Sequence, residues 1–166
     1  MKILVALALS LFVVTTASAG HRQTAYEDLV RWAGCDARVV TNDQYEIVQS
    51  VYDPNTHTIY LGGRDGLGLS REASEVIVLH EVGHCLQDQA GLFGVWTDVA
   101  LELDADRTAA NLSCALGRDG RQIMHDLFVW FHKSFGYDGD PAHGTLVQRI
   151  SQGDSAALCR AQEPQA

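Results

Sequence analysis

The sequence lacks the features that mark disordered or repetitive chains. It has no long tract rich in proline or serine, no block of like charge and no internal repeat. It also lacks a linker of the kind that separates domains. A composition with 46% hydrophobic and 20% charged residues excludes an intrinsically disordered chain. At 166 residues, the length is that of one folded domain.

Positive charge is scarce in this sequence. Twelve Lys and Arg stand against 21 Asp and Glu, so the formal net charge is −9. Without Lys2 the balance becomes 11 − 21 = −10. Such a surface repels nucleic acid and anionic lipid, so we expect neither as a partner.

The sequence has one long hydrophobic run, which lies at the N-terminus. Lys2 precedes an apolar stretch over 3–14, and small residues follow at 17–19. This order predicts a signal peptide over residues 1–19 and a single domain over residues 20–166. The alternative is an uncleaved anchor, but the run is far shorter than the roughly twenty residues that span a bilayer. We therefore expect a secreted or periplasmic protein with no stable membrane span after cleavage.

Hydrophobic periodicity predicts an α+β fold, with a helical core packed beside a small antiparallel β-hairpin or sheet. A turn signal at Asp53-Pro54-Asn55 places an antiparallel hairpin over 45–61. The helix over 71–90 is apolar on all sides at residues 76–79, which predicts that it is buried. The expected helices cover about 22–33, 71–90, 98–116, 120–135 and 144–152, and the expected strands cover 37–41, 45–52 and 56–61.

The buried helix carries an H-E-x-x-H pattern, His80-Glu81-Val82-Gly83-His84. Residues i and i+4 share a helix face, so both imidazoles can reach one metal ion. Glu81 is rotated by about 100° from His80 and is placed to take a proton from a metal-activated water. Gly83 has no side chain and lets another element approach closely. The pattern also occurs by chance, but two His and a Glu would be costly to bury in an apolar helix without a partner.

The next helix carries acidic residues at a useful spacing. Seventeen residues, 85–101, separate Glu102 from His84, which is enough for a turn and an antiparallel return. Two His and one Glu with an open fourth position are the ligands of a catalytic zinc site, so Glu102 is the predicted third ligand. Asp106 lies one turn further on and is expected to accept the N–H of His80. Asp104 points elsewhere and is expected to be a surface acid.

An even number of cysteines in an exported chain predicts two disulfides. Three pairings are possible. The antiparallel helices carry Cys114 about 18 Å beyond Glu102 and away from Cys85, which disfavours pairing these two. A zinc site built from the cysteines is disfavoured because none form a C-x-x-C pair. We favour Cys35–Cys85 with Cys114–Cys159.

A loop histidine, His143, precedes the last predicted helix. From there it can reach over the metal and stabilise the oxyanion of a tetrahedral intermediate. Tyr137, in the same loop, is the second candidate for this role. The remaining histidines are not expected to bind the metal. They are His21, His57, His125 and His132.

Three segments in this order resemble the motifs of the bacterial neutral zinc metallopeptidases. They are HEVGHCLQ at 80–87, ELDAD at 102–106 and HGTLVQR at 143–149. With the preceding hairpin, the resemblance spans about residues 45–152. It implies a gluzincin-like zincin fold, with Glu102 as a ligand and His143 near the site. Cys85 departs from the family, which often has a further His at this position.

The predicted function is therefore that of a secreted zinc metallopeptidase with one Zn²⁺ per chain. Glu81 would act as the general base, and a peptide or protein substrate would add as a strand to a free edge at 57–61. Two alternatives stay open: a non-catalytic zinc-stabilised module that binds a peptide or an envelope partner, and a zinc amidase acting on cell-wall peptide. An intact Glu81 favours an enzyme. The sequence does not indicate an oligomeric state.

Overall fold

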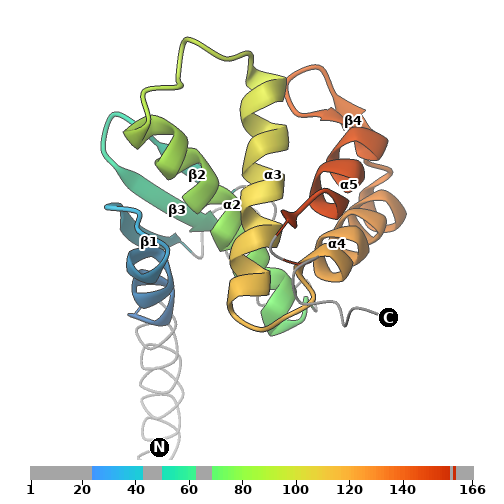
Figure 1. Cartoon of the computed structure of the whole chain (residues 1–166), viewed down its shortest axis with the longest axis horizontal. Coiled ribbons are helices and arrows are strands. Elements are labelled where there is room, and N and C mark those ends of the chain that lie inside the picture. The colour runs from blue at the N-terminus through green and yellow to red at the C-terminus, as the bar shows by residue number, and fades with distance from the viewer. Residues whose placement is uncertain (1–23, 43–49, 63–68, 158, 160–166) are drawn as a thin grey trace, which may run out of the picture.

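The computed structural model describes residues 24–42, 50–62, 69–157 and 159, and it confirms the α+β class. The predicted signal peptide, residues 1–19, lies outside the described residues. A small sheet and an N-terminal helix, described from residue 24 to 32, lie on one side of helix α2 (Figure 1). The other helices lie on the opposite side. Helix α2 thus lies between the two sides and contacts both of them.

The helices begin at polar residues that cap them. In each case the cap side chain accepts a backbone N–H three residues further on, which satisfies a donor that the helix itself leaves free. The helices are α2 (Arg71–Gln89, capped by Ser70), α3 (Asp98–Ala115, capped by Thr97), α4 (Gly120–Phe135, capped by Asp119) and α5 (Leu146–Asp154, capped by Thr145). Their bounds confirm the predicted helices to within two residues. In the described part of the chain, every helix is too short or too polar to cross a bilayer.

The main sheet has three strands in the order β1-β3-β2. They are β1 (Arg38–Asn42), β2 (Val51–Asp53) and β3 (Thr58–Gly62). The predicted antiparallel hairpin is confirmed for β2 and β3, while residues 45–49 of its expected first strand lie outside the described residues. In contrast, β1 runs parallel to β3, so the expected antiparallel sheet is wrong for this strand. Alternation of side chains between two faces is the same in both pairing directions, and it therefore did not reveal the direction of β1. Parallel pairing sets Val39 opposite Ile59, both fully buried.

The central position of β3 corrects a second prediction. Because β1 and β2 pair with β3 on either side, the free edge expected at 57–61 does not exist. Among the described strands, β2 and β1 form the edges of this sheet. Two further short strands, β4 (Gly139–Asp140) and β5 (Gly144–Thr145), form an antiparallel pair within the predicted loop before α5.

Helix α2 divides the interior into two hydrophobic cores. Val76 and Leu79 pack into a helical core with residues of α3, α4 and the C-terminal segment. Val78 and Val82 pack into a sheet core with β1, β2, β3 and the N-terminal helix. An apolar surface on both sides explains why residues 76–79 are hydrophobic without interruption.

Each core contains one disulfide. Cys35–Cys85 lies in the sheet core and Cys114–Cys159 in the helical core, with Cα–Cα distances of 5.9 and 5.1 Å. The favoured pairing is therefore confirmed. Two disulfides indicate an oxidising, extracellular type of environment.

Helices α2 and α3 meet at the glycine of the H-E-x-x-H pattern. A Cβ atom added to Gly83 would lie 2.8 Å from the Cα of Ala105 and 3.0 Å from its Cβ. The close approach that Gly83 was predicted to allow is thus present. Because Ala105 lies between Glu102 and Asp106 along α3, this contact brings both acids to the histidines of α2.

Candidate metal centre

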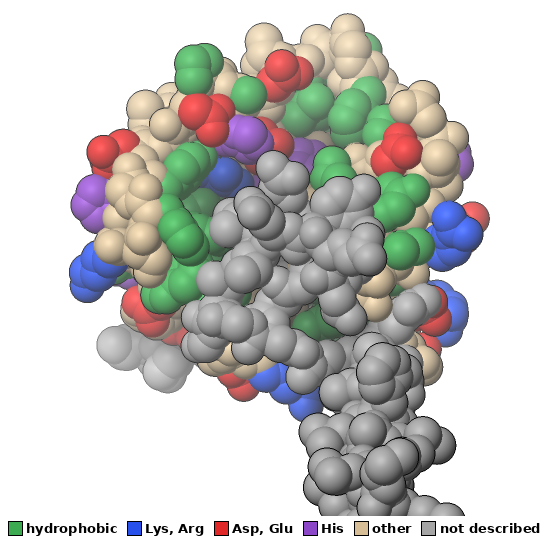
Figure 2. Space-filling view, turned by 180° about the vertical axis from the view of Figure 1, so that it is seen from behind, with side chains coloured by type: hydrophobic (Ala, Val, Ile, Leu, Met, Phe, Trp, Pro, Cys, Tyr) green, Lys and Arg blue, Asp and Glu red, His purple; other side chains and the backbone are tan. Residues whose placement is uncertain are grey.

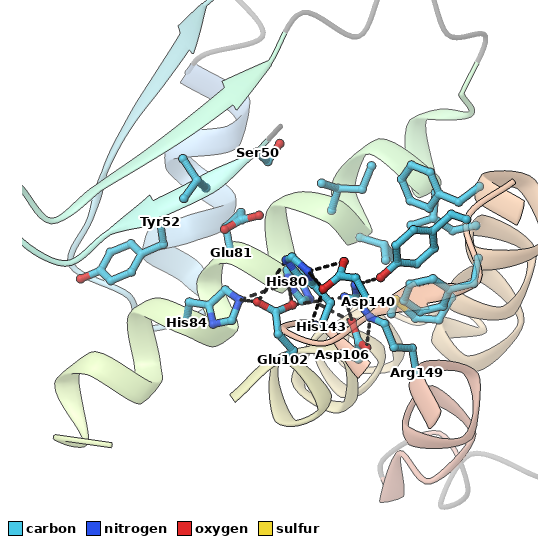
Figure 3. A pocket seen from close by; sticks show the side chains of 18 of the residues that line it. Ser50, Tyr52, His80, Glu81, His84, Glu102, Asp106, Asp140, His143 and Arg149 are labelled. Atoms are coloured by element: carbon cyan, nitrogen blue, oxygen red, sulfur yellow. Dashed lines mark hydrogen bonds and ion pairs between the residues drawn. The ribbon is translucent and has the colours of Figure 1, made fainter. Parts of the chain in front are cut away.

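Three side chains from α2 and α3 converge on one point (Figure 3). The Nε2 atoms of His80 and His84 are 3.2 Å apart. Glu102 places Oε2 3.3 Å from Nε2 of His80 and Oε1 3.2 Å from Nε2 of His84. Within the described parts of the chain, this is the group of His, Cys, Asp and Glu residues close enough together to hold a metal ion.

The spacing of these atoms fits a tetrahedral metal ion. Ligand atoms bound at 2.0–2.1 Å in tetrahedral geometry are roughly 3.3 Å apart, close to the separations found here. Oε2 of Glu102 is buried and makes no hydrogen bond, and Arg149, whose Nη2 lies 3.5 Å away, is already held by Asp106, so a cation bound beside this oxygen would offset the cost of burying it. Two imidazoles and one carboxylate also leave a fourth position open. The residues present therefore fit a divalent ion with room for a further ligand.

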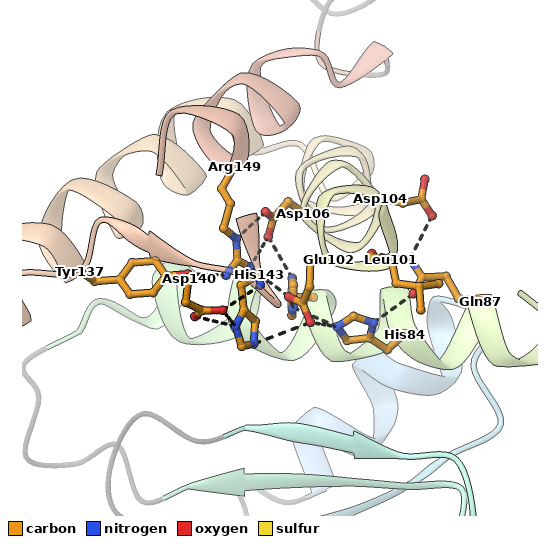
Figure 4. Close-up of polar contacts among 11 residues, drawn as sticks. His84, Gln87, Leu101, Glu102, Asp104, Asp106, Tyr137, Asp140, His143 and Arg149 are labelled. Atoms are coloured by element: carbon orange, nitrogen blue, oxygen red, sulfur yellow. Dashed lines mark hydrogen bonds and ion pairs between the residues drawn. The ribbon is translucent and has the colours of Figure 1, made fainter. Parts of the chain in front are cut away.

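Behind the metal-binding group lies a buried ion pair (Figure 4). Asp106 is fully buried, and its Oδ1 lies 3.0 Å from Nδ1 of His80, as the sequence predicted. Arg149 of α5 holds the same carboxylate through two hydrogen bonds of 2.8 Å, from Nε and Nη2. With Nδ1 of His80 turned to Asp106, Nε2 faces the metal position.

The charges of this group shift one another's pKa. Burial lowers the pKa of His80, but the carboxylates of Asp106 and Glu102 outweigh burial and raise it to about 10. Burial raises the pKa of Glu102, and the two neighbouring histidines more than reverse this, so its pKa lies far below the ordinary range. For Asp106, Arg149 and His80 outweigh the effect of burial and likewise lower the pKa. Without a metal, His80 therefore holds a proton that an incoming metal must displace.

His84 is oriented by a separate polar chain. Its Nδ1 donates to Oε1 of Gln87 at 3.0 Å, and Nε2 of Gln87 donates to the carbonyl oxygen of Leu101 at 2.7 Å. The same amide donates to Oδ2 of Asp104 at 3.1 Å. The prediction that Asp104 is a surface acid is therefore wrong in part, because one oxygen joins this network. We did not predict the role of Gln87, although its position three residues after His84 places both on one helix face.

His143 reaches the metal-binding group from the loop before α5. Its Nδ1 faces the carboxylate of Asp140 at 2.7 and 2.8 Å, and its Nε2 lies 3.9 Å from Oε1 of Glu102. Tyr137 lies further back, with its hydroxyl 3.5 Å from Nη1 of Arg149. The structure thus brings His143 close to the metal position and leaves Tyr137 beside the ion pair. Asp140 was not predicted, although its position three residues before His143 is a signal for it.

A cleft of about 440 Å³ opens onto the metal-binding group. Glu81, 5% exposed, lines it between the group and strand β2 (Figure 3). Val51 of that strand and Ser50, the residue before it, also line the cleft. On this face, histidine and acidic side chains gather between hydrophobic side chains (Figure 2). The cleft volume lies within the roughly 300–1,000 Å³ of ordinary ligand sites.

The other histidines take no part in this group. His125 lies 3.4 Å from Asp126, and His132 lies 2.8 Å from Asp138. Nδ1 of His57 faces the hydroxyl of Tyr52. His21 lies outside the described residues.

No protein-family model, no curated protein and no solved structure matches this chain. The resemblance to bacterial neutral zinc metallopeptidases accordingly stays a prediction that rests on the three motifs. The function of the site must be inferred from its own residues and their geometry.

Proposed function

We propose that this chain is a zinc-dependent peptidase of the gluzincin-like zincin type, related to the bacterial neutral zinc metallopeptidases. One zinc ion would be held by His80, His84 and Glu102. The observation that carries the proposal is the clustering of the ligand atoms: the two Nε2 atoms are 3.2 Å apart, and each lies 3.2–3.3 Å from one oxygen of Glu102, close to the edge length of a tetrahedral zinc site. The open fourth position distinguishes a catalytic site from a structural one.

The chain's own residues supply the proton transfers. A bound zinc ion would provide a Lewis acid that polarises a carbonyl and lowers the pKa of water to about 7. Glu81 takes the proton of the attacking water and passes it to the leaving amine. His143 donates Nδ1–H to Asp140, and in the imidazolium form it would also present Nε2–H to the negative charge that develops on the carbonyl oxygen. His143 is the better candidate for this role than Tyr137, because its Nε2 lies 3.9 Å from Glu102, whereas the hydroxyl of Tyr137 contacts Arg149.

Strand β2 supports the binding of an extended peptide. Ser50 and Val51 line the cleft, and Val51 is 52% exposed. A substrate that adds to this edge would satisfy its backbone hydrogen bonds and lie over Glu81. The sheet edge proposed to bind the peptide is thus β2, and not residues 57–61 as the sequence had suggested.

The position of Glu81 favours catalysis over binding alone. A buried acid facing the cleft beside a metal site is costly to keep, and a module that only binds a peptide has no use for it. A zinc amidase acting on cell-wall peptide would use the same groups. Assays with protein and with cell-wall peptide as substrates are therefore needed to distinguish a peptidase from an amidase.

The test combines metal analysis with digestion of an unfolded protein. We expect one zinc per chain, and hydrolysis that a chelator abolishes and zinc restores. Glu81→Gln should keep the zinc and lose activity by about 10²–10⁴-fold, because the general base is removed. Glu102→Ala should lose the zinc. Glu72→Gln, an exposed acid of the same helix, is the matched control and should behave as the wild type.

Undiminished hydrolysis by Glu81→Gln, or full zinc occupancy in Glu102→Ala, would exclude the proposal. Zinc binding with cleavage of cell-wall peptide alone would assign the amidase, and zinc binding with no hydrolysis would assign the binding module.

We further propose that residues 1–19 direct export, consistent with the oxidising environment that the disulfides indicate. Mass spectrometry of the protein collected outside the cytoplasm should give a chain that begins at Gly20. A chain that retains Met1 would contradict cleavage.

A further inference from the structure

The loop between α2 and α3 carries large hydrophobic side chains on its surface. Phe93, Val95 and Trp96 occupy three of four consecutive positions and are 38%, 74% and 40% exposed. Single exposed hydrophobic residues are common, but a contiguous group of them marks a surface that contacts another molecule. Phe93 also lines the cleft, so this group lies at the rim of the cleft.

The backbone of this loop is fixed by its own hydrogen bonds. The carbonyl oxygen of Leu92 accepts the N–H of Val95 at 3.0 Å and the N–H of Trp96 at 3.1 Å. Gly94, inside this turn, has a φ of 77°, a conformation that residues with a side chain disfavour. The turn therefore holds the hydrophobic side chains in place before a partner arrives, and contact with the partner does not have to order them.

The loop is also uncharged. Residues 89–97 include no charged side chain, and the charged residues that flank them, Asp88 and Asp98, are both acidic. The loop itself offers no charge to a partner of either sign, and the acids beside it repel an anionic partner. An electrically neutral, apolar partner therefore matches this surface.

The shape of the loop distinguishes between neutral partners. In Figure 1 it crosses the top of the molecule from the end of α2 to the start of α3, so it forms an outer edge of the fold. A protein partner would need a hollow that matches this edge. A lipid layer adapts its shape to a projecting group, and the boundary between its headgroups and acyl chains favours aromatic side chains such as Trp.

From these observations we infer that the α2–α3 loop docks on an electrically neutral lipid bilayer. Val95 and Trp96 enter the interfacial region, and the loop stays in that region without crossing the bilayer. The ring of Phe93 lies 6.4 Å from the ring of His84, so docking holds the metal-binding group and its cleft next to the membrane. One consequence rests on the proposed peptidase function, namely that the substrates are peptides at a membrane surface.

Flotation with phosphatidylcholine vesicles tests the docking. We expect the exported protein to bind reversibly, with half of it bound at a lipid concentration on the order of 0.1 mM, as for a single acyl anchor. Replacing part of the lipid by phosphatidylglycerol should weaken binding at low salt, because the acidic chain is repelled. No binding to phosphatidylcholine, or stronger binding to the anionic vesicles, would overturn the inference.

Substitutions assign the docking to this loop. Val95→Asp should lower the affinity for phosphatidylcholine vesicles about tenfold or more, because the new carboxylate has to leave the interface. Val147→Asp is the matched control, since Val147 lies on α5, is 76% exposed, and gains the same charge outside the loop. The control should bind as the wild type does. Equal losses of affinity in the two variants would overturn the inference.

Trp96 reports its own insertion. On vesicles whose acyl chains carry bromine, the tryptophan fluorescence should be quenched, and Trp96→Phe should keep the binding but lose most of the quenching. Unchanged quenching in Trp96→Phe would show that Trp32 or Trp130 enters the lipid instead, and this result would overturn the inference.

Sedimentation velocity and hydrolysis assays separate the remaining outcomes. A dimer that Val95→Asp dissociates, with no binding to vesicles, would assign the loop to a second copy of the chain and overturn lipid docking. Because vesicle binding needs no turnover, docking by a chain that cuts no peptide would exclude the peptidase proposal and leave the docking intact. Hydrolysis without docking would overturn the docking and leave the peptidase proposal intact.

Discussion

The two sides of helix α2 hold very different polar contacts. On the helical side, α3 and α5 bring a buried ion pair, Asp106–Arg149, against His80. On the sheet side, the hydroxyl of Tyr52 donates to Asp88 at 2.7 Å near the end of α2, and burial together with this carboxylate raises the pKa of Tyr52 well above its usual range. The helical side depends on charges that must stay paired, whereas the sheet side depends on apolar packing and a neutral donor.

This difference indicates a division of labour across α2. The helical side supplies the carboxylates and the orienting groups of the metal site, and the sheet side supplies strand β2 at the cleft. Loss of a polar group that α3 or α5 contributes to the metal site should therefore reduce both stability and metal affinity, whereas loss of apolar packing on that side should reduce stability alone. Damage to the sheet side should reduce stability alone, except where it reaches the histidines directly.

Removing a disulfide tests this comparison most sharply, because it should cause the largest loss of stability. They close loops of similar length, with separations of 50 and 45 residues, so loss of either should lower the free energy of unfolding by about 4 kcal/mol. Cys35–Cys85 adjoins His84, so the double change of Cys35 and Cys85 to Ala should also weaken zinc binding. The double change of Cys114 and Cys159 to Ala should leave zinc binding unchanged. Denaturant unfolding and zinc competition with a chelator measure the two effects, and equal zinc affinities in the two variants would show that the disulfide beside His84 does not help to position that ligand.

Asp106→Asn should lower the free energy of unfolding by about 3 kcal/mol, because Arg149 is left buried without its counter-charge. Zinc affinity should also fall about 10- to 100-fold, since His80 loses the group that orients it. Asp88→Asn is the sheet-side counterpart. It leaves Tyr52 an acceptor, so we expect a loss of about 1 kcal/mol and no change in zinc affinity. The same unfolding and competition assays apply, and an Asp88→Asn variant with weakened zinc binding would show that the two sides are coupled.

Gly83→Ala tests the contact between α2 and α3. The new Cβ would meet the backbone of Ala105, and the resulting strain should outweigh the better helix propensity of alanine, for a net loss of about 1–2 kcal/mol. Zinc affinity should fall because the two ligand-bearing helices move apart. Gly153→Ala is the control within α5, where a Cβ would meet the side chain of Met124 at 3.1 Å and the backbone is not involved. Calorimetric melting in the presence and absence of zinc compares the two, and equal shifts would argue against a special role for Gly83.

The smallest effect is expected at Gln87. Gln87→Met keeps the volume but removes the acceptor of Nδ1 of His84, which should lower stability by about 1 kcal/mol and zinc affinity about tenfold. Gln89→Met, at an exposed position of the same helix, should change neither quantity. Isothermal titration with zinc measures the difference. Unchanged affinity in Gln87→Met would mean that packing alone orients His84.

Much of the site could be predicted where its residues repeat at helical spacing. His80 and His84 share a face by periodicity, and Asp106 follows Glu102 at the same interval on α3. The structure brings all four together as expected. Asp140 was within reach of the same reasoning, since it precedes His143 by three residues, but an exposed loop acid is too common to single out.

Other features depend on contacts that no local pattern encodes. Arg149 meets Asp106 across 43 residues of sequence, and only the packing of α5 on α3 selects that partner. The direction of β1 and the central place of β3 likewise follow from how the strands assemble. Asp104 was misjudged for the same reason, because its partner Gln87 lies on another helix.

The sequence by itself determined the helices, the paired imidazoles and the number of cysteines available for disulfides. These follow from periodicity and chemistry within single elements, where neighbours along the chain are neighbours in space. Tertiary structure alone decided which edge of the sheet faces the cleft and that Arg149 is the partner of Asp106. Such features arise when separate elements bury their surfaces against one another, and residues distant in sequence become neighbours only then.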